Sequence, residues 1–421
     1  MTGAADAPHP PRLAGADWLS NPSALAVFAA LAAGGHEARA VGGAVRNALF
    51  GKAVKDVDIA TTATPEETMR LARAAGLKAH PTGIEHGTIT VVAGHEPYEV
   101  TTLRRDIETF GRHARVTFTT DWTEDAKRRD FTMNALYCAA DGTIHDPLGG
   151  YPDLAARRVR FIGDAHERIR EDYLRILRFF RLYAEYGRGE PDPTSLDACV
   201  AERTGLANLS GERIRAELLR MLAAPGAVDA AASLAIYGIL EPLHLHLDPH
   251  LLARLVAIET ALGRPPDPVL RLSALLLHKP EDVEHLKTRL RLSANEAETL
   301  ALVAGHHPHD SAVDPVTSER TARVGLYRMG VRRFELRALL AWARSPAPLD
   351  DPARRQRLAL PDRWPPPPLP FSGRDVLALG IPAGRAVGEA LARFETWWVD
   401  ADFPQDSGAL RDALARAVKG A

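Results

Sequence analysis

The sequence predicts an α+β protein with a small N-terminal α/β head, followed by an elongated all-α neck, body and tail. Strand and helix patterns alternate up to about residue 154, whereas the patterns from about residue 155 onward favour helices. The 421 residues correspond to about two to four domains. We expect a disordered tail over 1–20, a head over 21–154, a neck over 155–225, a body over 226–360 and a tail over 361–421.

The composition is that of an ordinary globular protein, with 46% hydrophobic and 25% charged residues. Two cysteines, Cys138 and Cys199, are too few for a disulfide framework or a CxxC metal knuckle, which fits a reducing compartment. No segment reaches the roughly 18 apolar residues of a membrane helix, so we expect a cytoplasmic protein that binds no membrane. The net charge of −2 does not by itself indicate a nucleic-acid binder, yet 157–181 and 320–344 are rich in arginine.

The head is expected to begin with an apolar helix over 23–35. A short strand then ends at a glycine pair, and the helix that follows is stopped by Gly51. The run VDIATT is a strand, and the next helix has Thr64 as its N-cap, Pro65 at its first position and Gly76 after its end. Two β-rich runs, GTITVVAG and YEVTTLR, are separated only by HEP, so they are expected to lie side by side as strands.

Helical patterns fill the rest of the chain. The stiff, extended connector WPPPPLP precedes the last of them. The expected helices span 165–186, 211–223, 226–239, 249–262, 269–278, 294–305, 319–344 and 373–396.

The run VGGAVRNALFGKAVKDVDIATT carries the strongest chemical signal. Asp56 and Asp58 lie two apart on the expected strand, so their carboxylates point to one face and can hold hard divalent cations. Two metals can activate an attacking oxygen and neutralise a triphosphate. Glu99, on a neighbouring strand, can add a third carboxylate. The alternatives are a strand end without a chemical role and an exposed strand glutamate.

Three residues near this strand suit a phosphate ligand. Gly42 and Gly43 lie between a strand and a helix, where the backbone can approach a phosphate and the helix N-terminus favours anions. Arg46 follows within the first turn and can bind phosphate with its forked donors.

The run RRDFTMNAL places Arg129 and Asp130 beside an apolar core, which suits a sugar hydroxyl and a phosphate. A helix start capped by Asp130 is the alternative.

These residues resemble those of the class II nucleotidyltransferases of the polymerase β superfamily, which are the CCA-adding enzymes (tRNA nucleotidyltransferases) and the bacterial poly(A) polymerases. The C-terminal runs GRDVLALG, IPAGRAVGEAL and WWVDADFP are similar to the tail of CCA-adding enzymes. The resemblance implies template-independent addition of C, C and A to the 3′ end of tRNA, from CTP and ATP, with release of pyrophosphate. Over roughly residues 40–185, it rests on GGAVRN, DVDIATTATPEE, GIEHGTITVV, EVTTLRRD, RRDFTMNAL, DPLGGYPDL and EDYLRILRFFR.

The resemblance also implies roles for individual residues. Asp56 and Asp58 would hold catalytic Mg²⁺ in a two-metal mechanism, with Glu99 as a further catalytic carboxylate. One departure is Asn47, which stands where the family's VRD motif has aspartate and puts any ionic role of that position in doubt. The nucleotide-binding residues would be Gly42, Gly43, Arg46, Arg129, Asp130, Asp172, Arg175, Arg178 and Arg181.

Two further segments acquire roles in the same way. The stretch from Arg104 through about Asp121 would be the flexible loop implicated in switching from C to A addition, and DPLGGYPDL would join head to neck. The body and tail would bind the acceptor stem and elbow of tRNA by shape and phosphate contacts. The arginines of 320–344 are candidates for these contacts, and no obligate protein partner is evident.

The run EDYLRILRFFR would replace a nucleic-acid template. A carboxylate such as that of Asp172 accepts hydrogen bonds and a guanidinium such as that of Arg175 donates them. Cytosine and adenine both offer an amino donor beside a ring-nitrogen acceptor, so both match this pair. Uracil and guanine present the opposite pattern, and each unsatisfied buried group costs on the order of 1–3 kcal/mol. The alternative is a surface ion pair between residues three apart on a helix.

Rival functions remain open. A poly(A) polymerase would use only ATP, and a partial enzyme would add only CC or only A. The run RLSALLLHKPED resembles the His-Asp position of an HD phosphohydrolase, so the body is a candidate degenerate HD-like region, with Lys279 where aspartate is needed. A metal-binding turn is the alternative to a surface loop for His306, His307, His309 and Asp310. Besides nucleotide addition and phosphohydrolysis, a third class of function is that of a catalytically inactive RNA-binding protein.

Overall fold

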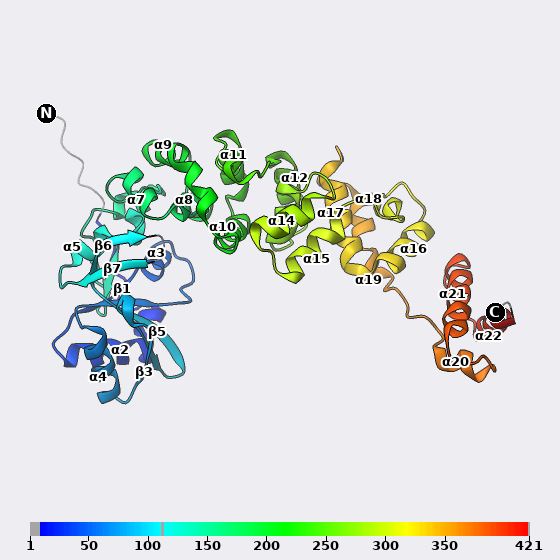
Figure 1. Cartoon of the computed structure of the whole chain (residues 1–421), viewed down its shortest axis with the longest axis horizontal. Helices are drawn as coiled ribbons and strands as arrows, with labels where there is room; N and C mark the ends of the chain where they lie inside the picture. The colour runs from blue at the N-terminus through cyan, green and yellow to red at the C-terminus, as the bar shows by residue number, and fades with distance from the viewer. Residues whose placement is uncertain (1–8, 111–112, 420–421) are drawn as a thin grey trace. The chain divides into compact units, whose positions relative to one another are not determined.

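The computed structural model describes residues 9–110 and 113–419, without the side chains of 106–110 and 113–115. The chain forms two compact units, Met1–Leu247 (unit 1) and Asp248–Ala421 (unit 2), each drawn in Figure 1. Within the described residues, every strand belongs to unit 1 and unit 2 is helical. The predicted α+β class, with a mixed-sheet head before an extensive helical region, is therefore confirmed.

A seven-stranded sheet forms the head. Its strands are β1 (Ala38–Val41), β2 (Asp58–Thr61), β3 (Lys78–Gly83), β4 (Thr88–Ala93), β5 (Glu96–Thr102), β8 (Tyr137–Ala139) and β9 (Ile144–His145). Their order is β3-β4-β5-β2-β1-β8-β9, and only β2 and β5 pair in parallel. The predicted neighbours β4 and β5 form an antiparallel hairpin through Gly94 and His95, whose φ angles of +54° and +73° fit a tight two-residue turn.

Helix α4 of the head begins where the sequence predicts, whereas α1, α5 and α6 were not predicted. The N-cap of α4 is Thr64, whose hydroxyl accepts a hydrogen bond from the Glu67 N–H at 3.3 Å. Helices α2 and α4 contact each other and strand β4, so they cover the same part of the sheet. The helices are α1 (Asp17–Ser20), α2 (Pro22–Ala33), α3 (Gly43–Leu49), α4 (Pro65–Ala74), α5 (Trp122–Lys127) and α6 (Tyr151–Ala155).

The predicted disordered tail over 1–20 is wrong for residues 9–20, while residues 1–8 lie outside the description. Arg12 forms an ion pair with Asp141 at 2.6 Å, and the Leu13 N–H donates to the Gly142 carbonyl at 2.8 Å. A Cβ atom on Gly142 would lie 2.3 Å from the backbone nitrogen of Ala14, so only glycine allows this close approach. Proline and small residues predicted a disordered segment, but these contacts hold Arg12 and Leu13 against Asp141 and Gly142.

The segment predicted as a flexible loop forms a second, two-stranded sheet. Strand β6 (Arg104–Phe110) pairs with β7 (His113–Phe118) in antiparallel fashion. The sequence run VTF near the end of β7 is rich in residues that favour strands, which explains the pairing. The Thr119 N–H then donates to the Leu103 carbonyl at 2.9 Å, which returns the chain to the head. Residues 111–112 lie outside the described part.

The neck helix predicted over 165–186 is divided in two. Asp172 has extended backbone angles (φ −155°, ψ 103°), and its carboxylate accepts from the Leu174 N–H at 3.2 Å. An aspartate can compete for backbone donors in this way, so it starts a new helix rather than continuing the old one. The helices of this part are α7 (Ala165–Glu171), α8 (Leu174–Tyr186), α9 (Pro193–Glu202), α10 (Gly211–Ala223) and α11 (Ala227–Ile236).

Packing ties α8 to the end of the head. Phe131, Phe161 and Phe179 are almost fully buried, and each pair of rings has centroids 4.6–6.4 Å apart. Such aromatic contacts add to the free energy gained by burying apolar surface. Helix α8 carries Arg175, Arg178 and Arg181, which we call the arginine ladder. This helix is therefore held against the residues that follow the strand-rich part of the head.

Unit 2 contains the remaining helices. The predicted helix 319–344 is broken at Gly330, whose φ of +76° ends one helix and starts the next. The predicted helix 373–396 is also broken, and a last helix that was not predicted follows it. The elements are α12 (Pro249–Ala261), α13 (Pro268–Leu276), α14 (Asp282–Leu290), α15 (Ala294–Val303), α16 (Glu319–Met329), α17 (Val331–Arg344), α18 (Pro352–Leu358), α19 (Leu360–Arg363), α20 (Gly373–Ala378), α21 (Arg385–Asp400) and α22 (Ser407–Lys419).

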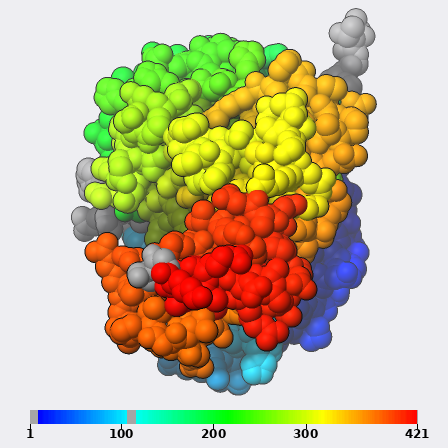
Figure 2. All heavy atoms as spheres, turned by 90° about the vertical axis from the view of Figure 1, so that its right-hand side faces the viewer, coloured from blue at the N-terminus to red at the C-terminus, as the bar shows by residue number. Residues whose placement is uncertain are grey.

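The C-terminal helices share a core of their own. Helices α20, α21 and α22 form one continuous mass, coloured orange to red in Figure 2, around the buried Phe394 and Trp398. The Trp398 ring also contacts Tyr327 of α16 edge-on, with centroids 5.7 Å apart. Arg328 pairs with Glu395 at 3.0 Å, and the Arg337 guanidinium binds Asp310. Several arginines of 320–344 therefore hold unit 2 together, and their role in RNA binding stays a prediction.

The boundary between the units lies at Leu247 and Asp248, inside the segment predicted as the body. Helix α11 contacts α8 and α10, so it packs with the predicted neck. The finer division into head, neck, body and tail stays a prediction. Among the described helices, none has the length and apolar character needed to cross a membrane.

Candidate active site

A cavity of about 600 Å³ in unit 1 collects the predicted nucleotide-binding residues. All nine of them line it, together with Asp58, one of the two predicted metal carboxylates. Asp56 and Glu99 do not line it. The lining residues are Gly42, Gly43, Arg46, Asp58, Arg129, Asp130, Asn134, Asp172, Leu174, Arg175, Arg178, Arg181, Arg213 and Arg220.

The three predicted carboxylates meet at β2 and β5, although not as one ligand cluster. Asp58 is the first residue of β2 and lies opposite Glu99 of β5. Asp56 precedes the strand, so the expectation that both aspartates lie on it is wrong for Asp56. The Asp58 side chain is exposed to solvent, yet partial desolvation of its carboxylate and the charges of Glu99 and Asp56 raise its pKa, while Arg129 lowers it.

This arrangement fits magnesium held jointly by protein and nucleotide. Within the described residues, no group of three or more His, Cys, Asp or Glu side chains converges as a complete metal cage. Magnesium is commonly bound by one or two carboxylates plus substrate phosphates and water, which does not require such a cage. A divalent cation beside Asp58 would also offset the repulsion among the three carboxylates.

The glycine pair forms the turn between β1 and α3. Gly42 has a φ of +69°, which favours glycine over any residue with a side chain. Gly43 begins α3, so the unpaired N–H groups of this helix start at the cavity wall. The predicted strand–glycine–helix order is therefore confirmed, and the backbone here is open to a phosphate.

Arg46 is buried and held by neighbours rather than extended into solvent. Its Nη1 donates to Asn134 at 2.5 Å and its Nη2 donates to the Tyr186 hydroxyl at 2.8 Å. Its guanidinium carbon lies 4.2 Å from the centre of the Tyr186 ring. The Nε atom is buried without a partner among the described residues. Direct binding of phosphate by Arg46 stays a prediction, because these contacts already occupy two of its nitrogens.

Arg129 is fixed at the cavity wall by a buried acid. Its Nη2 lies 3.0 Å from Asp125, and its Nε donates to the Tyr137 hydroxyl at 3.2 Å. Although burial alone would raise it, the pKa of Asp125 is lowered by the guanidinium groups of Arg129 and Arg128. Asp125 and Tyr137 were not predicted as parts of the site. They position Arg129 beside Asp58.

Asp130 and Arg178 form an ion pair that joins the head to α8. The Arg178 Nε lies 2.8 Å from the Asp130 carboxylate, which also accepts from Asn134 and from the Phe131 N–H. Burial opposes ionisation, but Arg178 and these hydrogen bonds hold the pKa of Asp130 well below its usual range. The predicted helix start capped by Asp130 is replaced by a single short turn over Thr132–Asn134.

Asp172 and Arg175 both line the cavity, but they are not paired with each other. Asp172 lies 2.6 Å from the Arg213 Nη2 of α10. The Nη1 of Arg175 donates to the Glu171 carboxylate and to the Arg168 carbonyl. The alternative of a surface ion pair between Asp172 and Arg175 is therefore wrong, because each side chain binds a different element.

Two charged cavity residues were missed in the sequence. Arg213 and Arg220 both belong to α10 and lie seven positions apart, which is about two turns of one helix face. That spacing in GERIRAELLR is the signal that sequence reasoning had available. With them, seven arginines face three carboxylates across the cavity, which favours a polyanionic ligand.

Comparison with known proteins identifies the family to which the chain belongs. Residues 38–160 match the family described as the poly A polymerase head domain, and residues 190–251 match a probable RNA- and SrmB-binding site of polymerase A. A Danio rerio protein named CCA tRNA nucleotidyltransferase 1, mitochondrial, is 37% identical over 90% of this chain and 88% of its own length. The chain belongs to the CCA tRNA nucleotidyltransferase family.

Other relatives agree with this membership. A CCA-adding enzyme of Geobacillus kaustophilus is 43% identical over 51% of this chain and 53% of its own length. A solved structure described as the CCA-adding enzyme of Bacillus stearothermophilus in complex with CTP is 28% identical, with a TM-score of 0.70. That match covers 94% of this chain and 98% of the other.

Membership in the CCA tRNA nucleotidyltransferase family makes the Asn47 departure informative. The Asn47 Oδ1 accepts from the Arg46 Nη2 at 3.2 Å and from the Tyr186 hydroxyl at 2.7 Å. An amide oxygen can accept both hydrogen bonds without a negative charge. The position therefore serves here as a neutral acceptor that orients Arg46.

The histidine-rich turn over residues 306–310 has a structural role in this chain. The Asp310 carboxylate binds the Arg337 guanidinium through two hydrogen bonds, of 2.5 and 2.7 Å, so it is already paired. Burial and the nearby Arg333 and Arg337 lower the pKa of His307. In the part of unit 2 that the structure describes, these groups do not gather as a metal site.

Proposed function

We propose that this member of the CCA tRNA nucleotidyltransferase family adds C, C and A in sequence to the 3′ end of tRNA. The substrates are CTP and ATP, and pyrophosphate is released. The single observation that carries the proposal is the cavity in which Asp58, seven arginines and Asp172 face one space. It combines a carboxylate for metal binding, donors for phosphate and a carboxylate for base recognition.

The reaction is a phosphoryl transfer without a nucleic-acid template. The 3′-hydroxyl of tRNA attacks the α-phosphate of the nucleotide, and the bond between the α- and β-phosphates breaks. Asp58 and Asp56 are the residues that would hold Mg²⁺, with Glu99 beside them. Bound magnesium supplies charge neutralisation of the triphosphate and activation of the attacking hydroxyl. The backbone at Gly42 and Gly43 and the guanidinium of Arg129 would orient the phosphates.

Base selection would use Asp172 and Arg175 as a fixed pair of partners. A carboxylate offers about four acceptor positions, and Asp172 uses one for Arg213 and one for the Leu174 N–H. Every described contact of the Arg175 guanidinium is made by Nη1, which leaves Nη2 and Nε to donate to a ring nitrogen. The pair would accept cytosine or adenine and reject uracil or guanine, whose donors and acceptors are reversed.

Incorporation into defined tRNA substrates tests the proposal. Purified protein is incubated with tRNA that ends before CCA, after C or after CC, and with labelled CTP, ATP or both. Addition of exactly the missing nucleotides supports a complete CCA-adding enzyme. Long tails from ATP alone would identify a poly(A) polymerase, and exclusive CC or A addition would identify a partial enzyme.

The compartment is a separate proposal. The vertebrate relatives are called mitochondrial, and this chain shows the same composition as ordinary globular proteins of any compartment. We retain a cytoplasmic location as the prediction, which fractionation of cells that express the protein would test.

A further inference from the structure

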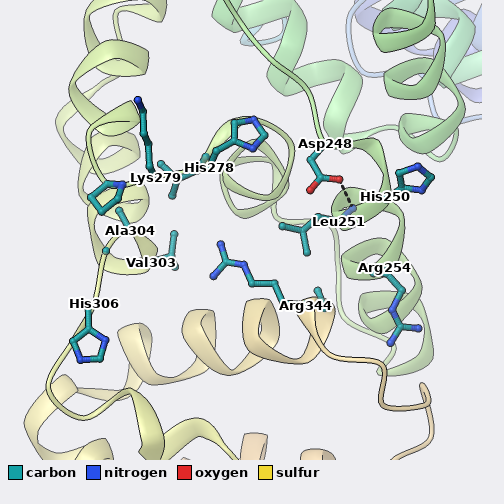
Figure 3. A pocket seen from close by; sticks show the side chains of 14 residues that line it. Asp248, His250, Leu251, Arg254, His278, Lys279, Val303, Ala304, His306 and Arg344 are labelled. Atoms are coloured by element: carbon teal, nitrogen blue, oxygen red, sulfur yellow. Dashed lines mark hydrogen bonds between the residues drawn. The ribbon is translucent and has the colours of Figure 1, made fainter.

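A second hollow lies entirely within unit 2. Its volume is about 750 Å³, which is similar to that of the nucleotide cavity of unit 1. It is formed where α12 begins and where α13, α15 and α17 end. Figure 3 shows its side chains, among which Arg344 extends into the open space between Val303 and Leu251.

The lining of this hollow carries a surplus of positive charge. Arg254, Lys279 and Arg344 contribute cations, whereas Asp248 is the only acidic residue of the lining. The Asp248 carboxylate is already engaged, because it accepts from the Leu251 N–H at 2.9 Å and caps α12. The three cations outnumber this one carboxylate, so the lining as a whole favours a bound anion.

Arg344 is, with Lys279, one of two cations of the lining whose charged groups have no protein partner among the described residues. Among the described residues, its guanidinium makes no hydrogen bond or ion pair, whereas Arg254 donates to the Ala347 carbonyl at 2.7 Å. The Arg344 side chain is exposed, and partial desolvation and the nearby Arg337 lower its pKa, while Asp248 and Asp310 raise it, so its guanidinium remains charged and open to a ligand. The Arg337 guanidinium, rather than that of Arg344, donates to the carbonyl groups of Leu302, Ala304 and Gly305 near the end of α15.

We propose that this hollow binds a phosphate group, with the Arg344 guanidinium as its principal donor and Lys279 at the rim. A guanidinium presents parallel donors that match two phosphate oxygens, which makes arginine the side chain best suited to this contact. The phosphate could belong to a free nucleotide or pyrophosphate, or to the backbone of RNA. The second source rests on the proposed function, in which tRNA is a substrate of the protein.

The sequence of the hollow supports an anion over a metal. Lys279 stands at the position where an HD-type site has the aspartate that binds a metal. The change from aspartate to lysine removes a ligand for a cation and adds a donor for an anion. The backbone N–H groups of His278 and Lys279 are used by Asp282, at 2.9 and 3.0 Å, so the turn that presents Lys279 is fixed.

Hydrogen–deuterium exchange on the full chain tests the proposal. The probes are inorganic pyrophosphate and a short RNA duplex, without CTP or ATP, so that binding is measured independently of nucleotide addition. We expect at least one probe to protect the amides of 303–306 and 343–347 in the wild-type protein. Arg344→Gln should weaken that binding about tenfold, because a hydrogen bond to a charged group is lost. Arg385→Gln is the matched control, since its side chain is 93% exposed and pairs only with Glu389 in the described structure.

The outcomes separate the two sources and the two proposals. Protection by pyrophosphate that Arg344→Gln weakens supports a free phosphate ligand. Protection by RNA alone supports a backbone phosphate, and the slope of log affinity against log salt should then fall by about 0.7–0.9 in the variant. Absence of protection by either probe, or equal protection in the variant, overturns the site whether or not the protein adds CCA. If Arg344→Gln does not fold, Lys279→Gln is compared in the same way, with a smaller loss expected.

Discussion

The ion pair between Asp172 and Arg213 gives a direct test of base selection. The two side chains are about 15% exposed, with relative accessibilities of 16% and 14%, and their closest atoms lie 2.6 Å apart. In Arg213→Gln, the Asp172 carboxylate keeps its hydrogen bond from Leu174 but loses its ion pair. It is then free to rotate away from the position in which it would accept the amino group of cytosine.

The magnitude follows from the partial burial of this pair. A hydrogen bond between charged groups contributes about 1.5–3 kcal/mol, and water that reaches the pair reduces this to about 1–2 kcal/mol. That range corresponds to a loss of about fivefold to thirtyfold in kcat/KM for CTP. The value for UTP should change less, because UTP gains nothing from a correctly placed carboxylate. The ratio of CTP to UTP use should therefore contract by a similar factor.

Single-nucleotide incorporation into tRNA that lacks CCA measures both values. Arg170→Gln is the matched control, because Arg170 belongs to the adjacent α7, is 59% exposed and pairs with Glu202 outside the cavity. It should change kcat/KM by less than about twofold. The double variant with Asp172→Ala should lose no more discrimination than Asp172→Ala alone. A folded Arg213→Gln protein with the wild-type ratio of CTP to UTP use would refute the reasoning.

Three further predictions concern the head. Asp58→Asn should lower kcat for CTP addition by at least about 100-fold, since it removes the carboxylate proposed to hold Mg²⁺, while circular dichroism stays unchanged. Asp130→Asn should lower the free energy of unfolding by about 2–4 kcal/mol in urea at pH 7, because it leaves a partly buried guanidinium unpaired. The native pKa of Asp130 is depressed, so its contribution is present above about pH 4 and is lost as the pH falls towards that native pKa; the difference from wild type should shrink below about pH 3. Asn47→Asp should raise Tm by a few degrees through its charge beside Arg46 and change kcat/KM by less than about threefold.

Local chemistry made much of the site predictable. The glycine turn and the strands that carry Asp58 and Glu99 follow from short patterns with a period of two or from capping residues, whereas the parallel pairing of these two strands was not predicted. Side chains that such patterns place on one face stay together whatever the rest of the chain does. The family resemblance, rather than these local patterns, linked the glycine turn to Arg129, Asp130 and the arginines of α8, and all of them line a single cavity.

Partner choice was less predictable, because it depends on which elements pack together. Asp172 pairs with Arg213, which lies 41 residues further along the chain, rather than with Arg175. The helix break at Asp172 has a local origin, since its carboxylate accepts from the Leu174 N–H while its backbone is extended and ends α7. The prediction for the N-terminal segment was wrong for a similar reason, because its contact with Gly142 involves backbone atoms that composition does not reveal.

The arginine ladder of α8 shows how the fold prepares the site before a ligand arrives. Arg175, Arg178 and Arg181 each bind a carboxylate from a different element, namely Glu171 of α7, Asp130 of the head and Glu217 of α10. A held side chain has already lost its rotamer freedom, so nucleotide binding need not bear that entropy. The same carboxylates reduce the net charge that the arginines offer to any polyanion. In the proposed function, the arrangement would therefore favour discrimination between bases over raw affinity for nucleotides, which is what an enzyme without a nucleic-acid template requires.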